Sequence, residues 1–370
     1  MIVLCVLTGW ILWKGHGRLS EVRLSASNEI ISAFQQPSSS SSSSSSLSQR
    51  VFVLSSETFP TVSHDLSVKL DLPQFSKQDL IRMDLSFVIP PYALIVDPYD
   101  YGTNIKDHAI ALQSIGISSR KRGKKQQFNF VTKPFYIDFN PLSSTRLSQR
   151  AQSGDMLIKA VSPKDMHVVD LTAGLGQDSM LLAMAGAKQV SMVERNPIVI
   201  ALLSDGLRRL RILSEHANDD VTRERTTFLV HRLSLQSGDG RDVIREITNN
   251  DATWPNNAPD IVYLDPMFPT RKKSASVKKN MQLLHGILDS QNIHENVRLQ
   301  EEILLLQSSL RIAKRKVVVK RPINAPALGH DDRGTVLPKS VELPTPSYDI
   351  RGSINRWDVY VTTEYRSSEQ

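Results

Sequence analysis

The sequence predicts an α/β protein whose core is a mostly parallel, doubly wound sheet. Apolar runs of strand length alternate with helical patterns between residues 167 and 320, and a glycine-containing turn follows the first of these runs. Two strand-like segments then flank a short turn near the C-terminus. Strands that alternate with helices favour a parallel sheet, because each helix carries the chain back to start the next strand in the same direction. The terminal pair predicts an antiparallel hairpin that closes the sheet.

The elements follow one another from residue 167 onward. The run "HVVDL" at 167–171 is typical of a short buried strand, and an apolar helix then ends near Gly186. A second strand is expected at 189–194, and Pro197 suits the first turn of the helix that follows it. The same patterns predict strands at 261–265 and 316–320, a helix at 296–313, and hairpin strands within 347–352 and 356–364.

The chain of 370 residues is long enough for more than one domain. Nine consecutive serines, Ser38 to Ser46, bury no apolar surface and predict a flexible linker. We therefore expect three parts. These are a targeting-like and Ser-rich disordered segment at 1–50, a small N-terminal α/β region with a basic loop at 51–133, and the main domain at 134–370.

The first 13 residues are apolar, which is short for a bilayer span of roughly 20 residues. Basic and Ser-rich residues follow, so this segment is either a targeting signal, or else a misassigned gene start or a disordered tail. The only cysteine, Cys5, excludes an intrachain disulfide and indicates a reducing compartment. We expect an intracellular protein, cytoplasmic or, if the segment is a signal, located in a plastid or mitochondrion, with no membrane role for the mature chain.

The formal net charge of +7 suits a polyanionic partner. Basic runs occur at 120–125, 271–273, 314–316 and 320–321, and each alone is more often a solvated face than a binding site. The nine histidines show no spacing typical of metal ligands, so no metal is expected.

Ligands of doubly wound sheets bind over the carboxyl ends of the strands, where the informative loops of this chain fall. Gly174 and Gly176 permit a tight turn after the first strand, and Asp178 either bonds a ligand or caps the helix. Glu194 ends the second strand, where an acid accepts ribose hydroxyls, although it could instead pair with Arg195. Asp239 follows a third strand and either accepts from an adenine amino group or caps a helix.

The stretch "YLDPMFP" at 263–269 decides between a dinucleotide and S-adenosylmethionine as the ligand. Its two prolines end the strand and stiffen the loop, which holds Asp265 and Phe268 in fixed directions. A strand-end Asp-Pro-x-Phe resembles the motif of class I methyltransferases that modify exocyclic amines of nucleobases. Dehydrogenases have no use for such a loop.

Four segments in order carry a closer resemblance: "VVDLTAGLGQDSMLLA", "VERNPIVIALLSDGLRR", "IVYLDPMFPTRKKSASVKK" and "KRKVVVKRPINAPAL". Over about residues 134–363 the chain resembles the ribosomal RNA small subunit methyltransferase J family. The resemblance implies a class I, Rossmann-like fold and methylation of a guanine N2 amine in small-subunit ribosomal RNA. It also implies S-adenosylmethionine as the methyl donor and the ribosomal RNA or subunit as the partner.

The resemblance also assigns site residues. The cofactor would be bound by Gly174, Gly176, Gln177, Asp178, Glu194, Arg195, Asp239, Gly240 and Asp265. Gln177 replaces an arginine of the family pattern, and Asp239 and Gly240 replace a pair of serines.

The residues of the proline-rich loop also suggest how the amine is handled. The Asp265 carboxylate and the Pro266 carbonyl would accept the two amine N–H bonds, and Phe268 would stack on the flipped base unless it is a core residue. Arg271, Lys272, Lys273, Lys320 and Arg321 would bind RNA phosphates. Two other functions remain open, which are methylation of a different RNA or a protein amide, and non-catalytic RNA binding in ribosome assembly.

Overall fold

The computed structural model describes residues 3–5, 10–15, 18–23, 50–82, 90–118, 127–143, 145–152, 154–249, 258–266, 287, 295–330 and 343–362. The chain divides into two compact units, Met1–Ser39 and Ser40–Gln370. The first unit holds an antiparallel sheet in the order β1-β2-β3, with strands β1 (Val3–Cys5), β2 (Trp10–Gly15) and β3 (Arg18–Arg23). The sequence predicted a disordered segment here, so these strands are a departure from that expectation.

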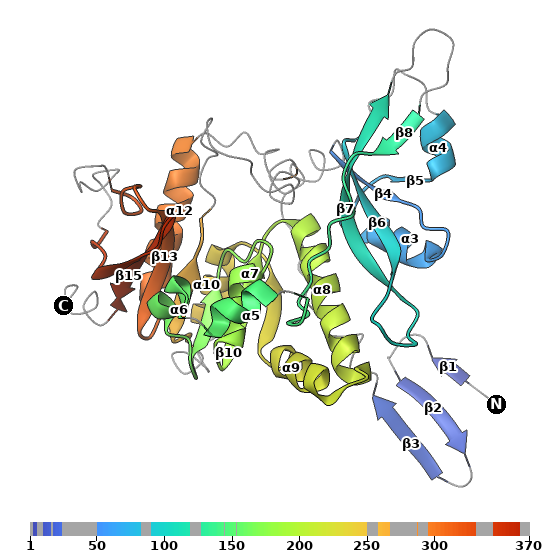
Figure 1. The fold of residues 1–370 in the computed structure, drawn as a ribbon, viewed down its shortest axis with the longest axis horizontal. Coiled ribbons are helices and arrows are strands. Elements are labelled where there is room, and N and C mark those ends of the chain that lie inside the picture. The colour runs from blue at the N-terminus through green and yellow to red at the C-terminus, as the bar shows by residue number, and fades with distance from the viewer. Residues whose placement is uncertain are drawn as a thin grey trace. The chain divides into compact units, whose positions relative to one another are not determined.

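The second unit begins with a five-stranded sheet in the order β5-β4-β6-β7-β8 (Figure 1). Its strands are β4 (Val51–Leu54), β5 (Gln74–Phe75), β6 (Tyr92–Tyr99), β7 (Asp107–Ser118) and β8 (Gln127–Phe130). Strand β4 pairs in parallel with β5 and β6, whereas β6, β7 and β8 form an antiparallel meander. Two helices accompany the sheet, α3 (Pro60–Leu70) and α4 (Lys77–Arg82). The small α/β region predicted from the sequence is therefore present, while its basic run at 120–125 lies outside the described residues.

A seven-stranded sheet forms the main body, in the order β11-β10-β9-β12-β13-β15-β14. Its strands are β9 (His167–Asp170), β10 (Gln189–Glu194), β11 (Leu233–Ser237), β12 (Ile261–Leu264), β13 (Lys316–Pro322), β14 (Tyr348–Arg351) and β15 (Asn355–Val361). The first five strands are parallel. Strand β15 is antiparallel to both β13 and β14, which confirms the predicted closing hairpin.

Helices cover both faces of this sheet, as a doubly wound fold requires. One face packs against α5 (Thr145–Gln152), α6 (Met156–Val161), α7 (Gln177–Met184), α8 (Pro197–His216) and α9 (Asp220–Val230). The opposite face packs against α10 (Gly240–Asn249) and α12 (Glu295–Ile312). Neighbouring strand residues divide between the faces, so Val168 belongs to one core and Val169 to the other.

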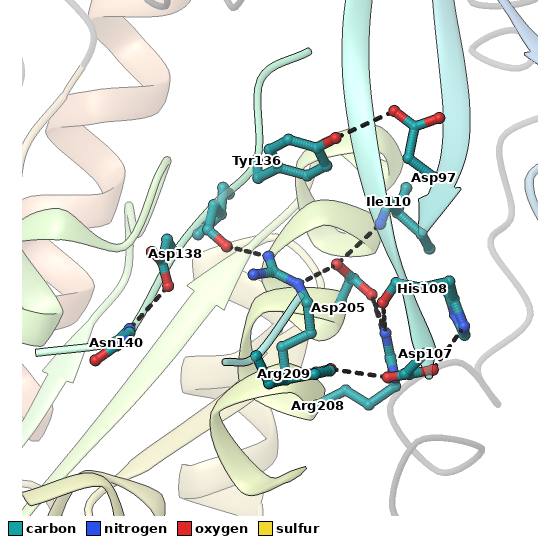
Figure 2. A network of polar contacts seen from close by, with 12 residues as sticks. Asp97, Asp107, His108, Ile110, Tyr136, Asp138, Asn140, Asp205, Arg208 and Arg209 are labelled. Atoms are coloured by element: carbon teal, nitrogen blue, oxygen red, sulfur yellow. Dashed lines mark hydrogen bonds and ion pairs between the residues drawn. The ribbon is translucent and has the colours of Figure 1, made fainter. Parts of the chain in front are cut away.

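A buried polar network joins α8 to the five-stranded sheet (Figure 2). The Asp205 carboxylate accepts hydrogen bonds from the Ile110 backbone N–H in β7 at 3.0 Å and from Arg209 Nε at 2.8 Å. Arg208 donates to the other oxygen of Asp205 at 2.8 Å and also to Asp107. Asp205 is only 2% exposed, so these bonds replace its lost hydration.

Candidate active site

Three acid-bearing strand ends meet at one edge of the main sheet. Strands β10, β9 and β12 are parallel neighbours, so Glu194, Asp170 and the residue after β12, Asp265, all lie toward their carboxyl ends. The loop after β9 reaches two of these acids. Its Thr172 Oγ1 accepts the backbone N–H of Asp265 at 2.6 Å, and its Gly174 N–H donates to Glu194 Oε2 at 3.0 Å.

This loop depends on its two glycines. Gly174 and Gly176 have φ angles of +52° and +69°, a region that favours glycine. A Cβ at Gly176 would also lie 2.8 Å from the Phe139 ring, so the position has no room for a side chain. Around Gly174 the nearest atom to such a Cβ is a backbone oxygen at 3.8 Å, which leaves its backbone open to a ligand.

Glu194 is held in place by backbone donors. Its Oε1 accepts from the N–H groups of Arg195 at 2.9 Å and Asn196 at 2.7 Å, while Oε2 accepts from Gly174. Burial raises the pKa of Glu194, and these three hydrogen bonds partly oppose the rise. A carboxylate has about four acceptor positions, so Oε2 retains capacity for one more donor, such as a ribose hydroxyl.

The Arg195 side chain lies near two acids other than Glu194. Its Nη1 lies 3.5 Å from both Asp239 Oδ2 and Glu301 Oε2, so the salt bridge considered between Arg195 and Glu194 is absent. Asp239 also accepts from the Arg241 backbone N–H at 3.0 Å at the start of α10, which matches the helix-cap interpretation. Gly240 is buried in the same turn, where a Cβ would lie 3.1 Å from Leu305.

An ammonium group joins two of the site carboxylates. Lys320 Nζ lies 2.8 Å from Asp178 Oδ2 and 2.7 Å from Asp265 Oδ2, and the Tyr263 hydroxyl donates to the same Asp178 oxygen at 2.8 Å. The ammonium of Lys320 and the Tyr263 hydroxyl help to lower the pKa of Asp178 against the effect of burial. Desolvation raises the pKa of Asp265, and Lys320 opposes that rise.

Behind these groups lies a buried acid, Asp170. It accepts from Ser179 Oγ at 2.5 Å and from the Thr172 backbone N–H at 3.1 Å. Burial raises its pKa to about 7, and the charges of Asp178 and Asp265 add to the rise. Asp170 is 1% exposed, so it supports the loop rather than contacting a ligand.

The structure changes two predicted RNA contacts. Lys320 lies between carboxylates, and its side chain is only 20% exposed. Arg321 is 7% exposed, and its Nε donates to the Pro326 carbonyl at 3.0 Å. A buried guanidinium engaged in this way is not placed to bind a phosphate of a bulky RNA, so the predicted role of Arg321 is wrong in this structure. Phe268, Arg271, Lys272 and Lys273 lie outside the described residues.

Sequence reasoning missed the link between Lys320 and Asp265, although a signal for it exists. In the parallel pair of β12 and β13, Leu264 is opposite Val319, so the next residues of the two segments are Asp265 and Lys320. Aligning "IVYLD" with "KVVVK" end to end would have placed the two charges side by side. Gln177, expected to bind the cofactor, begins α7 with an exposed side chain.

The chain is similar to known methyltransferases. The model of a family described as "Putative SAM-dependent methyltransferase" matches residues 104–362, well over half of the chain. Three relatives carry the name "Ribosomal RNA small subunit methyltransferase J". The protein from Pseudoalteromonas atlantica is 39% identical over 56% of this chain and 68% of its own length. The proteins from Pseudomonas aeruginosa and Dechloromonas aromatica are 36% and 34% identical over 61% of this chain, and over 74% and 78% of their own lengths.

The chain belongs to the ribosomal RNA small subunit methyltransferase J family. Its cofactor is therefore S-adenosylmethionine, and the strand-end residues fit that molecule. Glu194 presents an acceptor at the end of β10, and Gly174 offers an open backbone beside it. Methyl transfer is the chemistry that this family performs, so the expected fold and enzyme class are both confirmed.

Within the described residues, no helix is long and apolar enough to cross a membrane. The same residues contain no group of three or more His, Cys, Asp or Glu side chains arranged to hold a metal ion.

Proposed function

We propose that this enzyme methylates the exocyclic N2 amine of a guanine in small-subunit ribosomal RNA. The observation that carries the proposal is the position of Asp265, an acceptor fixed at a strand end beside the cofactor loop. The names of the relatives supply the class of RNA. The family resemblance of the "DPMFP" loop supplies the amine.

The cofactor would lie along the β9 and β10 strand ends. Glu194 Oε2 would accept a ribose hydroxyl, and the backbone at Gly174 would approach the cofactor closely. Asp239 would accept from the adenine amino group with the acceptor capacity that its bonds to Arg241 leave. When bound, S-adenosylmethionine supplies an electrophilic methyl group on a positively charged sulfur.

The target amine needs acceptors because its lone pair is delocalised into the guanine ring. Asp265 Oδ2 is occupied by Lys320, whereas Oδ1 has no hydrogen-bond partner among the described residues. The side chain is 35% exposed, and Oδ1 would accept one amine N–H. The Pro266 carbonyl would accept the other, and the two bonds together let the nitrogen pyramidalise and direct its lone pair at the methyl carbon.

Positioning of this kind contributes on the order of 7 to 11 kcal/mol to lowering a barrier. A bond forms between nitrogen and the methyl carbon as the carbon–sulfur bond breaks, and the alkylated nitrogen then releases one proton. Because this proton becomes acidic only after alkylation, no strong base is required beforehand, and Asp265 Oδ1 would receive it.

The test is methyl transfer in vitro followed by nucleoside analysis. Purified enzyme, labelled S-adenosylmethionine, and either bacterial small-subunit RNA or assembled small subunits are combined, and the RNA nucleosides are separated by mass spectrometry. The proposal predicts label in N2-methylguanosine with at least one of the two substrates. Label in another nucleoside, or only in protein, would contradict it.

A further inference from the structure

The side chain of Lys320 joins the cofactor side of the site to the target side. Asp178 lies in the first turn of α7, directly after the glycine loop, and Asp265 follows β12. Lys320 Nζ contacts an oxygen of each at 2.8 Å and 2.7 Å. Two elements to which the proposed function assigns different substrates are thus connected by one ammonium group.

The contacts are stronger than those of an ordinary surface pair. The Lys320 side chain is 20% exposed and that of Asp178 is 19% exposed, so water screens their attraction only weakly. Charge-assisted hydrogen bonds of this length are about twice as strong as neutral ones. Both carboxylates and burial act on Lys320, and the net effect is a raised pKa, so the group stays charged at neutral pH.

Among the other titratable groups near Asp265, Asp178 from α7 opposes its ionisation. Asp170 from β9 is a further acid, and Tyr263 from β12 is a buried neutral phenol. Arg150 from α5 acts on Asp178 but is itself bonded to Asp155 at 2.6 Å. Among the described residues, Lys320 is the cation in direct contact with Asp265.

We propose that Lys320 is a positioning residue that keeps Asp265 ionised and turned so that Oδ1 faces the target amine. This inference rests on the proposed function, because it assigns the reason for holding Asp265. With Oδ2 bound to the ammonium and the backbone N–H bound to Thr172, the carboxylate is restrained from two sides. The remaining oxygen is then presented in one direction.

The role differs measurably from a phosphate contact. A lysine that binds a phosphate strengthens RNA affinity and adds about one unit to the salt slope of binding. A lysine that positions Asp265 changes the methyl-transfer step and its pH dependence instead. These two outcomes can be separated with one substitution.

The test compares Lys320→Met and Lys320→Arg with Lys316→Met. Lys316 lies on the same strand and donates to the Ala160 carbonyl at 2.8 Å, outside the acid group, so it is a matched control. For each protein, single-turnover methylation is measured from about pH 5 to pH 9, together with RNA affinity at several salt concentrations. Lys320→Gln replaces Lys320→Met if the latter does not fold.

Lys320→Met is expected to lower the single-turnover rate at neutral pH by about 10- to 100-fold, by analogy with the loss of groups that orient metal-binding side chains. Without the ammonium the pKa of Asp265 rises further, so the acidic limb of the rate profile moves to higher pH. Lys320→Arg should restore most of the rate and the wild-type limb. RNA affinity and its salt slope should stay unchanged in all variants, and Lys316→Met should behave as wild type.

An unchanged rate and limb in Lys320→Met, or a reduced salt slope with weaker RNA binding, would overturn the proposal. Carbon-13 NMR titration of the aspartate carboxyls in the presence of S-adenosylmethionine, with Asp265→Asn used to assign the resonance, needs no RNA. The Asp265 resonance should titrate at higher pH in Lys320→Met than in wild type, and an unshifted titration would overturn the proposal even if the RNA substrate were different. Failure of wild type to modify guanine would count against the proposed function alone.

Discussion

At the scale of single residues, Glu194 has two tasks that are usually separate. It accepts three backbone N–H bonds that shape the ligand loop, and it retains one acceptor position for the ligand. Removal of this carboxylate therefore affects both loop and affinity. The sequence indicated only the second task, because strand-end position predicts a ribose contact but says nothing of nearby backbone donors.

Glu194→Ala should weaken binding of S-adenosylmethionine by about 1 to 3 kcal/mol, the range for leaving polar groups unsatisfied. Calorimetry measures this loss, and it should also show no binding of NAD to wild type. Glu301→Ala is the control, since it removes a carboxylate near Arg195 without touching the Gly174 loop. Equal losses of affinity in both variants would show that Arg195, and not a ribose contact of Glu194, accounts for the loss.

Asp170 gives the fold a pH dependence. Burial raises its pKa to about 7, against an ordinary value of 3.8 in the unfolded chain. Between these values the folded protein binds the extra proton, so the contribution of Asp170 to stability is present at low pH and is lost as pH rises toward 7. The gap corresponds to on the order of 4 kcal/mol.

Asp170→Asn removes this titration while retaining an acceptor for the Thr172 N–H. The free energy of unfolding of the variant minus that of wild type should therefore grow more positive from about pH 5 to pH 8. Urea unfolding at several pH values measures the difference, and contributions from acids that do not interact with Asp170 cancel. A difference that is constant with pH would show that Asp170 is already ionised in the folded state.

At the scale of elements, sequence patterns located the main strands well. The runs expected at 189–194 and 316–320 correspond to β10 and β13, and the terminal hairpin formed in the expected direction. These elements were predictable because apolar periodicity and turn residues are local. The partners of Asp205 were not predictable, since its bond to Ile110 joins residues 95 positions apart.

The Asp205 network should be a main source of stability for the packing of α8 on β7. Asp205→Ala leaves the buried Arg209 and the half-buried Arg208 without this partner, which typically costs about 3 to 5 kcal/mol. Asp242→Ala is the matched control, because its pair with Arg245 has side chains 62% and 69% exposed. That control should change the free energy of unfolding by less than about 1 kcal/mol.

Denaturant unfolding followed by circular dichroism measures both variants. A loss for Asp205→Ala as small as that of the control would mean that the network adds little to the folded state. It would also mean that contacts other than this network hold α8 against β7.

At the scale of the whole molecule, the segment before the serine run is separable. Met1–Ser39 forms a unit of its own, and the methyltransferase residues all lie in Ser40–Gln370. The family match likewise begins at residue 104.

A protein beginning at Ser40 should fold and methylate RNA at the full-length rate. This start retains the Arg50 carbonyl, which accepts the Tyr92 N–H at 3.0 Å where strands β4 and β6 begin. Thermal melting and the in vitro methylation rate measure the outcome. A shortened protein that is folded but inactive would assign the first unit to the enzyme, whereas a changed location of a fluorescent fusion in cells would support a targeting signal.

Some of the site residues could be predicted from the sequence because their signals are local. A strand end and a proline-rich loop, both visible in the local sequence, indicate Glu194 and Asp265 as site residues. The burial of Arg321 depends on the tertiary structure and cannot be predicted from its charge. Charge runs predict solvated surfaces on average, and the 320–321 run is an exception because the strand that carries it lies inside the sheet between β12 and β15.

The central claim is that Asp265 orients the guanine amine, and Asp265→Asn tests it most directly. The amide keeps the shape of the side chain but loses the charge that Lys320 pairs with and that the amine would meet. The single-turnover rate of methyl transfer to small-subunit RNA should fall by about 10² to 10³, the effect of losing one preorganised electrostatic contact. S-adenosylmethionine affinity, measured on the same protein, should change by much less than the rate. A wild-type rate for Asp265→Asn on guanine-containing ribosomal RNA would contradict the mechanism.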